Sequence, residues 1–203
     1  MSIVLVRHGE TDGNATRVLQ LPDVPLNERG MRQAERLAER LQTLDITQIV
    51  CSDLLRARMT AAPIAARLGL QVETTPLLQE RNFGDLRGQA YASLSSNPFA
   101  PDFAPPNGES WPVFRQRVEH AFAYIAQLRA KLSEGQLLVV THGLVCRAMF
   151  ERHIAWLEPG VPPERFHNTA VNVLDPQAPF AARLANCCTH LDPADVEPLG
   201  GAA

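Results

Sequence analysis

Apolar positions along the chain form short continuous runs, separated by longer stretches in which apolar residues recur with helical spacing. The short runs are rich in valine, isoleucine and leucine, which is typical of strands buried on both faces of a sheet. We predict such strands at residues 2–6, 47–51, 70–75 and 136–140, and edge strands at residues 170–175 and 181–187.

The longer stretches predict amphipathic helices. In residues 28–43, apolar side chains recur every three or four positions with charged residues between them, so one helix face is apolar. Similar segments lie at residues 54–68, 113–132 and 143–153. Ser52 and Asp53 are candidate caps for the helix at 54–68, and Gly69 is expected to end it.

Strands and helices therefore alternate through most of the chain. This order is typical of an α/β fold, with a single domain and a central, mostly parallel sheet flanked by helices. The chain has 203 residues, of which 45% are hydrophobic, and this suffices for one domain with a sizeable core. We predict that the domain spans residues 1–192 and that residues 193–203 form a frayed tail.

Residues 94–112 differ from the rest of the chain because their five prolines exclude regular helix and sheet. A long irregular segment in a compact domain is usually either a binding loop or a disordered one. Phe99, Phe103 and Trp111 give this segment apolar surface. We hypothesise that it lies over a functional site and selects the ligand; the alternative is that the aromatic residues only anchor a surface loop.

Charge and hydropathy exclude several kinds of partner. Nineteen basic and 22 acidic residues give a net charge of −3, so there is no overall basic field to attract nucleic acid. No run approaches the roughly 18 consecutive apolar residues of a membrane span. No charged leader with an apolar run and a cleavage site is found at the N-terminus, so we expect a cytoplasmic protein. The pattern does not predict the oligomeric state.

The cysteines and most of the histidines are expected to play no chemical role. Cys51 and Cys146 lie in apolar runs, and Cys187 and Cys188 are adjacent, so we interpret all four as reduced thiols. His190 follows the adjacent pair, but a second ligand pair at metal-binding spacing is missing. The histidines expected to be structural or exposed are His120, His153, His167 and His190.

Four basic side chains are predicted to meet at one edge of the sheet. Arg7 and His8 follow the first strand, Arg56 lies in the first turn after the second strand, and His142 ends the fourth strand. The carboxyl ends of parallel strands share one edge, where such folds bind ligands. The helix expected to begin at Gly143 adds free N–H groups and a positive dipole end. Together these features predict a phosphate pocket.

The chain has neither a P-loop nor an Asp-rich metal-binding cluster, so phosphoryl chemistry requires another nucleophile. A neutral imidazole can attack phosphorus and form a covalent intermediate. The arginines supply the positive charge that a metal ion supplies elsewhere. We therefore expect phosphoryl chemistry with no metal and no cofactor, and a small phosphorylated metabolite as the partner.

The segment Arg7-His8-Gly9-Glu10-Thr11 resembles the signature of the histidine phosphatase superfamily, also called the phosphoglycerate mutase-like family. Further resemblances follow in order at Asn14, Pro25–Gly30, Ser52–Ala57, Glu80–Gly84, Gly108–Ser110 and Thr141–Gly143. The resemblance covers roughly residues 2–175, and several matches in the family's order are far more specific than one short motif.

The resemblance implies a role for each site residue. His8 is the nucleophile, and Glu80 is the acid that protonates the leaving oxygen and then the base that activates water. Arg7, Arg56 and His142 bind the phosphoryl oxygens, with help from Asn14 and from the helix start at Gly143. Two roles stay open: Asn14 is alternatively a helix or turn cap, and Arg81 alternatively binds substrate or lies on the surface.

Three departures from the family pattern bear on the activity. Leu144 stands where the mutases carry asparagine, and the chain is shorter than typical mutases and lacks their paired arginines; both features favour the phosphatase branch. Leu21 stands where many relatives carry glycine, and we expect it to narrow the pocket entrance. The alternatives are a phosphoglycerate mutase-type phosphotransferase and a catalytically silent module that binds a phosphorylated ligand.

Overall fold

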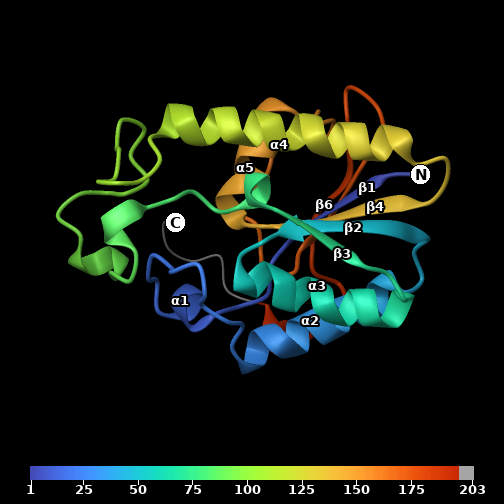
Figure 1. Ribbon diagram of the computed structural model, residues 1–203, viewed down its shortest axis with the longest axis horizontal. Helices are drawn as coiled ribbons and strands as arrows, with labels where there is room; N and C mark the ends of the chain where they lie inside the picture. The colour runs from blue at the N-terminus through green and yellow to red at the C-terminus, as the bar shows by residue number, and fades with distance from the viewer. Residues whose placement is uncertain (197–203) are drawn as a thin grey trace.

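Six strands form one sheet in the computed structural model, which describes residues 1–196 (Figure 1). The strands are β1 (Ile3–Arg7), β2 (Ile46–Ser52), β3 (Val72–Thr75), β4 (Gln136–Thr141), β5 (Val171–Leu174) and β6 (Ala182–Cys187). Their order across the sheet is β3-β2-β4-β1-β5-β6. The first four are parallel, whereas β5 runs antiparallel to β1 and β6 antiparallel to β5. The predicted α/β fold with a mostly parallel sheet is confirmed.

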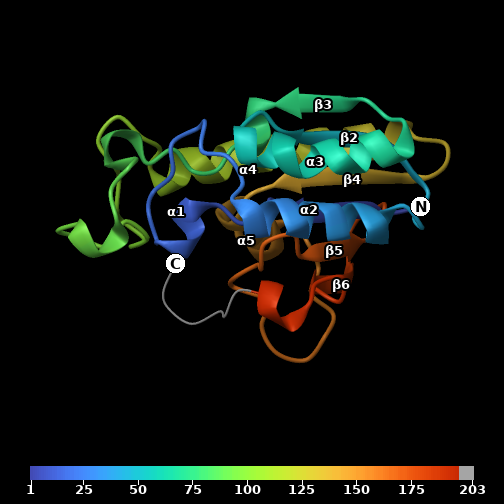
Figure 2. The ribbon, with the colours of Figure 1, turned by 90° about the horizontal axis from the view of Figure 1, so that it is seen from below.

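Helices cover both faces of this sheet. They are α1 (Asp12–Ala15), α2 (Glu28–Leu41), α3 (Leu55–Leu68), α4 (Trp111–Lys131) and α5 (Gly143–Arg152), with short 3-10 turns at η1 (Pro76–Leu78), η2 (Gly84–Leu86), η3 (Tyr91–Ser93) and η4 (Pro193–Asp195). Figure 1 shows the layers, with α4 and α5 on one face of the sheet and α2 and α3 on the other, and Figure 2 looks onto the face covered by α2 and α3. The parallel strands therefore have helices on both sides, which explains their continuous apolar runs.

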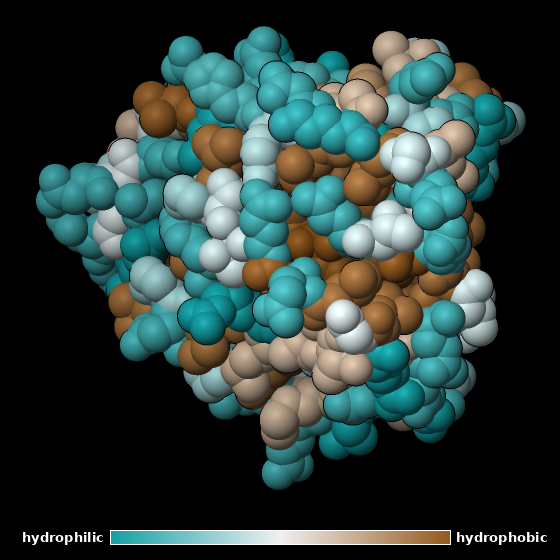
Figure 3. All heavy atoms as spheres, turned by 45° about the vertical axis from the view of Figure 1, so that its right-hand side comes forward, coloured by the Kyte–Doolittle hydropathy of each residue, from teal (hydrophilic) through white to brown (hydrophobic). Residues whose placement is uncertain are grey.

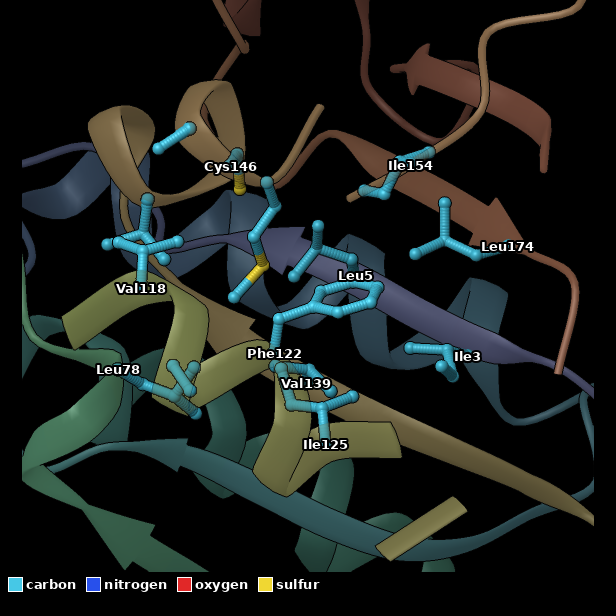
Figure 4. Packing of buried hydrophobic residues seen from close by; sticks show 14 of the residues in the cluster. Ile3, Leu5, Leu78, Val118, Phe122, Ile125, Val139, Cys146, Ile154 and Leu174 are labelled. Atoms are coloured by element: carbon cyan, nitrogen blue, oxygen red, sulfur yellow. The ribbon is translucent and has the colours of Figure 1, made fainter. Parts of the chain in front are cut away.

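Each layer has its own apolar core. On the α4 and α5 face, Leu5 and Val139 of the sheet pack with Phe122 and Ile125 of α4, and Cys146 of α5 lies in the same cluster (Figure 4). A second cluster joins β1, β2 and β4 to the apolar stripes of α2 and α3. Figure 3 shows one face of the molecule, on which apolar side chains gather in a central hollow framed by polar ones.

The prediction that residues 170–175 form an edge strand is wrong. β5 lies between β1 and β6, so of the two strands predicted to be edge strands only β6 is at an edge. The polar residue in β5, Asn172, is fully buried, and its amide donates to the Leu5 carbonyl at 2.9 Å and accepts from the Asn186 N–H at 2.8 Å. A buried asparagine with both groups satisfied is compatible with an interior strand.

Three predicted boundaries also need correction. The N-cap of α3 is Leu54, with no side-chain cap, so Ser52 and Asp53 do not cap the helix. The irregular segment ends at Ser110, which caps α4, because proline fits the first helical turn. The start of the expected tail is ordered: the Gln33 side chain donates to the Asp195 carbonyl at 2.8 Å. Residues 197–203, the rest of the expected tail, lie outside the described part.

Candidate active site

The two histidines of the predicted site lie side by side at the carboxyl edge of the sheet. β1 and β4 are parallel neighbours in which Arg7 pairs with Thr141, so His8 and His142 are the next residue of each strand's continuation. The His8 N–H donates to the Thr141 carbonyl at 2.9 Å, and the two imidazole centroids are 5.0 Å apart. The sheet register therefore brings together residues 134 positions apart in sequence.

His8 is held as a neutral imidazole with one nitrogen available. The residue is only 3% exposed, and burial lowers the pKa of His8 well below its ordinary value, as do the charges of Arg56 and Arg7. Its Nδ1 lies 2.7 Å from the Gly9 carbonyl, which can only accept, so Nδ1 carries the proton. Nε2 is left with a lone pair, as a nucleophile requires.

The contacts of His142 favour the same tautomer as in His8, with the ring proton on Nδ1. Nε2 of His142 lies 2.8 Å from the Ser52 hydroxyl oxygen, which itself accepts from the Leu54 N–H at 3.3 Å. The hydroxyl can donate its proton to Nε2 of His142 while it accepts from Leu54, and in that arrangement Nδ1 carries the ring proton. Burial, followed by the Arg56 charge, lowers the pKa of His142, so this ring is also neutral. Within residues 1–196, its buried Nδ1 has no hydrogen-bond partner.

Two arginines surround the histidines. Arg56 comes from the first turn of α3, is 3% exposed, and donates to the Leu21 carbonyl at 3.1 Å. Burial lowers the pKa of Arg56 to about 10, so the guanidinium keeps its charge at neutral pH. Arg7 donates to the Phe166 carbonyl at 2.5 Å. In the described structure both Nε atoms are buried without a partner, which is costly unless a ligand supplies an acceptor.

The pKa of Glu80 is shifted in the opposite direction to the pKa values of the two histidines. One carboxylate oxygen accepts from the Leu144 N–H at 3.1 Å, and the other accepts from the Arg81 N–H at 3.0 Å. Burial raises the pKa of Glu80, although these two hydrogen bonds and the Arg56 and Arg7 charges oppose the rise. This carboxyl therefore keeps its proton to a higher pH than an exposed glutamate does.

A cavity of about 450 Å³ brings most of the predicted site residues together. Its lining includes Arg7, His8, Asn14, Arg56, Glu80, Arg81, Gly143 and Leu144. His142 lies against His8 and is fully buried rather than part of the lining. A larger groove of about 640 Å³ beside α2 and α3 contains none of these residues, so the smaller cavity is the candidate active site.

Asn14 both caps α1 and lines the cavity. Its side-chain oxygen accepts from the Thr11 N–H at 3.2 Å, and its own N–H donates to the Thr11 hydroxyl, so the two residues form a capping box at α1. The same side chain lines the cavity. Asn14 is therefore fixed by the helix start in a position from which it faces the ligand.

Arg81 is not on the surface, and most of its donors bind backbone carbonyls. It is 1% exposed, and its guanidinium donates to the carbonyls of Glu109, Pro98 and Phe103 at 3.0, 3.1 and 2.7 Å. The guanidinium carbon also lies 4.0 Å from the centroid of the Trp111 ring. Burial lowers the pKa of Arg81 to about 10, so it remains a cation. Its donors hold the irregular segment, although the residue borders the cavity.

Three residues that support the site were not identified from the sequence as parts of it. Ser52 fixes the tautomer of His142, and the Thr60 hydroxyl accepts from the Gly9 N–H at 2.9 Å. The Asn168 side chain donates to the His8 carbonyl at 2.9 Å. Ser52 follows the second predicted strand, which was a usable signal, whereas Thr60 and Asn168 act across long sequence separations that carry no local pattern.

Two other carboxylates, Glu10 and Glu109, are held in ion pairs with arginines. Glu10 is 3% exposed, pairs with Arg29 at 3.0 Å, and accepts from the Asn27 amide. Glu109 pairs with Arg117 at 2.7 Å, and hydrogen bonds from Arg117 and the Asn82 N–H lower the pKa of Glu109 despite burial. Glu80 is therefore the lining carboxyl with a raised pKa.

The remaining sequence expectations are answered as follows. The Leu21 side chain is 48% exposed and absent from the cavity lining, so it does not narrow the entrance. All four cysteines are free thiols. Within residues 1–196, no group of three or more His, Cys, Asp or Glu side chains is placed to hold a metal ion. The helices of that part are too short or too polar to cross a membrane.

Comparisons with known proteins give the family to which this fold and site belong. The chain belongs to the histidine phosphatase superfamily (branch 1), whose profile matches residues 3–182. It is 40% identical to phosphoglycerate mutase-like protein 4 of Arabidopsis thaliana, over 84% of this chain and 77% of that protein.

Two further relatives show that the family contains proteins named as mutases and proteins named as phosphatases. A protein of Enterobacter sp. (strain 638) bearing a phosphoglycerate mutase name, GpmB, is 32% identical over 98% of this chain and 99% of its own. The alpha-ribazole phosphatase from Shigella flexneri superposes with a TM-score of 0.77 at 28% identity, covering 92% of this chain and 96% of that one.

Proposed function

We propose that this protein is a phosphatase that hydrolyses phosphomonoesters through a phosphohistidine on His8. One observation carries the proposal: His8 and Glu80 face the same cavity with their pKa values displaced in opposite directions. A neutral imidazole beside a protonated carboxyl is the arrangement that nucleophilic attack and leaving-group protonation require at neutral pH. Family membership and the structural likeness to a phosphatase support the same assignment.

In the first step, Nε2 of His8 attacks phosphorus, and the bond between phosphorus and the leaving oxygen breaks. Glu80 gives its proton to that oxygen, so the product leaves as a neutral alcohol. Negative charge on the phosphoryl oxygens is stabilised by Arg7 and Arg56, with Nδ1–H of His142 as a further donor. The unpartnered Nε atoms and Nδ1 are the donors that such an anion satisfies.

In the second step, Glu80 is a carboxylate and accepts a proton from water. The water oxygen attacks phosphorus, the N–P bond breaks, and inorganic phosphate leaves while His8 regains its neutral form. Glu80 regains in this step the proton that it lost in the first step. In total, one water and one phosphomonoester give one alcohol and one phosphate. The same two residues serve both steps, as microscopic reversibility requires.

The electrostatic work is assigned to arginine rather than to a metal ion. The positive charges of Arg7 and Arg56 act on the nucleophile, and within residues 1–196 the carboxylates of the lining form no group that could hold a metal ion. Turnover of p-nitrophenyl phosphate should therefore be unchanged by excess EDTA, and vanadate, which mimics five-coordinate phosphorus, should inhibit it. Activity that is lost with EDTA and restored by magnesium or zinc would contradict this assignment.

The rival phosphoryl-transfer activity is a mutase, which two relatives' names favour. Against it, the apolar side chain of Leu144 lines the cavity in place of the asparagine found in the mutases. The deciding experiment follows phosphate release from a panel of phosphomonoesters and, separately, exchange between 2- and 3-phosphoglycerate. Phosphate release without exchange supports the phosphatase, and exchange without net release supports the mutase. Binding with neither reaction identifies a silent module.

A further inference from the structure

The cavity has an aromatic wall, which comes from the irregular chain between β3 and α4. Tyr91 and Phe99 line it while remaining partly exposed, and their ring centroids are 5.2 Å apart in an edge-to-face contact. Buried Phe83 supports Phe99 from behind, with centroids 5.7 Å apart. Two partly exposed rings therefore contribute surface to the cavity.

This wall is held in place before any ligand binds. The chain at residues 17–19 runs beside residues 88–91, with the Leu19 N–H donating to the Gln89 carbonyl at 3.0 Å and the Tyr91 N–H donating to the Arg17 carbonyl at 2.9 Å. Arg81 holds the Pro98 carbonyl next to Phe99. A wall already fixed in this way loses little freedom on binding, which favours affinity for a matching group.

Arg87 adds polar recognition to the same region. It is partly buried and lines the cavity. Burial lowers the pKa of Arg87, while the charge of Glu109 opposes this, so the group remains a cation. A cationic fork beside aromatic rings offers donors to acceptor atoms on a flat ligand.

The size of the cavity matches a ring-bearing ligand. Its volume of about 450 Å³ falls within the range of roughly 300–1,000 Å³ typical of sites for larger organic molecules. A phosphorylated three-carbon acid would leave the aromatic wall in contact with water, so the wall would contribute nothing to its binding.

We propose that the alcohol released by this phosphatase carries a planar ring with hydrogen-bond acceptors, which packs on Tyr91 and Phe99 and accepts from Arg87. The substrate class is thus a nucleoside-like phosphomonoester rather than a phosphoglycerate. This inference rests on the phosphatase function proposed above. We name the ring-binding region, formed by Phe83, Arg87, Tyr91 and Phe99, the leaving-group half of the cavity.

The test compares substrates that differ only in the ring. Adenosine 5′-monophosphate and uridine 5′-monophosphate are compared with ribose 5-phosphate, which has the same phosphorylated sugar without a base. We expect kcat/KM for the better nucleotide to exceed that for ribose 5-phosphate by about tenfold or more, as base stacking on aromatic side chains produces. Phe99→Ala should reduce this ratio to near one, and Arg87→Met should reduce it in part.

Phe103→Ala is the matched control, since Phe103 lies in the same segment but not in the cavity lining, and its carbonyl contact with Arg81 survives the substitution. It should keep the wild-type ratio. A wild-type ratio near one for both nucleotides, or equal effects of the two phenylalanine variants, would overturn the ring assignment.

Failure of the phosphatase proposal has a different signature. In that case none of the three esters releases phosphate above the level of His8→Ala. Calorimetric titration of the same esters into His8→Ala protein then answers the ring question without turnover. Tighter binding of a nucleotide than of ribose 5-phosphate supports the ring subsite, and equal binding rejects it.

Discussion

The two halves of the cavity are built by different means. The phosphoryl half, formed by Arg7, His8, Arg56 and Glu80 with His142 buried against His8, takes most of its residues from the ends of strands and the first turn of a helix. The leaving-group half takes its residues from irregular chain between β3 and α4, braced by backbone contacts with residues 17–19 (Figure 1). The strand ends therefore carry most of the groups proposed to react with the phosphoryl group, and the loops shape the region proposed to contact the rest of the substrate.

The halves also differ in how they are stabilised. In the phosphoryl half, cations and neutral histidines are buried together with several donors unsatisfied, which costs stability in the unliganded protein. In the leaving-group half, the buried cation Arg81 has carbonyl acceptors for all three of its donor nitrogens. Substitutions in the first half should therefore affect chemistry most, and substitutions around Arg81 should affect stability and selectivity.

The largest effect is expected for His8→Ala. Removing the nucleophile abolishes the covalent route, so kcat should fall by on the order of 10³-fold or more for every substrate. Wild-type protein quenched during turnover should carry a phosphoramidate that is labile in acid and stable in base, and the variant should carry none. The exposed residue His120 supplies the control, since His120→Ala should keep both activity and label.

Two observations would contradict the assignment of His8. The first is substantial turnover by His8→Ala with any of the esters. The second is an acid-stable label on serine, or a label on an acyl phosphate, which would identify another nucleophile. Either result would also contradict the proposed difference between the two halves of the cavity, because the nucleophile would then not lie at the end of a strand.

The next largest effect is expected for Glu80→Gln. General acid catalysis typically contributes about 10²–10⁴-fold, so kcat/KM for an alkyl phosphate should fall by that amount. The fall should be much smaller for p-nitrophenyl phosphate, whose leaving group needs little protonation. Comparing kcat/KM is essential, because it reports the step up to release of the alcohol and excludes the later hydrolysis of phosphohistidine.

The pH dependence has a definite sign. Glu80 must be protonated in the first step, and burial raises its pKa, so kcat/KM for alkyl phosphates should fall as pH increases through that raised value. The fall should be weak for p-nitrophenyl phosphate and absent in Glu80→Gln. Equal losses for both substrates in the variant would show that Glu80 is not the acid, and Asp53 would be the next carboxylate to test.

A smaller effect, mainly on stability, is expected for Arg81→Met. The substitution leaves the carbonyls of Pro98, Phe103 and Glu109 without donors, at about 1–3 kcal/mol for each that stays buried. We expect the free energy of unfolding to fall by about 3 kcal/mol, and protease cleavage to increase within residues 94–110. The nucleotide preference should fall, while p-nitrophenyl phosphate turnover should persist.

Arg58→Met is the control for Arg81→Met, because Arg58 is an exposed arginine on α3. It should leave unfolding and the nucleotide preference near wild type. If Arg81→Met instead lowers turnover of all esters equally without destabilising the protein, Arg81 contacts the phosphoryl group, as one of the two sequence interpretations had it.

The same contrast explains what sequence reasoning could and could not predict. The central strands and the main helices were predicted within a few residues, because buried runs and amphipathic stripes are local patterns. His8 and His142 were placed together because parallel strands end at one edge. The interior position of β5 and the anchoring role of Arg81 were not predicted, because each depends on partners distant in sequence. Arg81 binds carbonyls, which have no residue signature.

The smallest effect concerns acid stability, and it separates the halves once more. The pKa of His8 is lowered in the folded protein, whereas a histidine in the unfolded chain titrates near 6.5. Below about pH 6.5 the unfolded chain therefore binds more protons, so this contribution to stability is complete above that pH and is lost as pH falls.

Tm should decrease from pH 7 to pH 5.5 in the wild type, and less so in His8→Asn. His142, His153 and His190, whose pKa values are also lowered, remain in both proteins, so the comparison isolates the contribution of His8. Phe99→Ala, in the uncharged wall, should lower Tm by the same amount at both pH values. An unchanged pH dependence in His8→Asn would show that His8 is not held neutral by the fold, and the nucleophile assignment would lose its electrostatic basis.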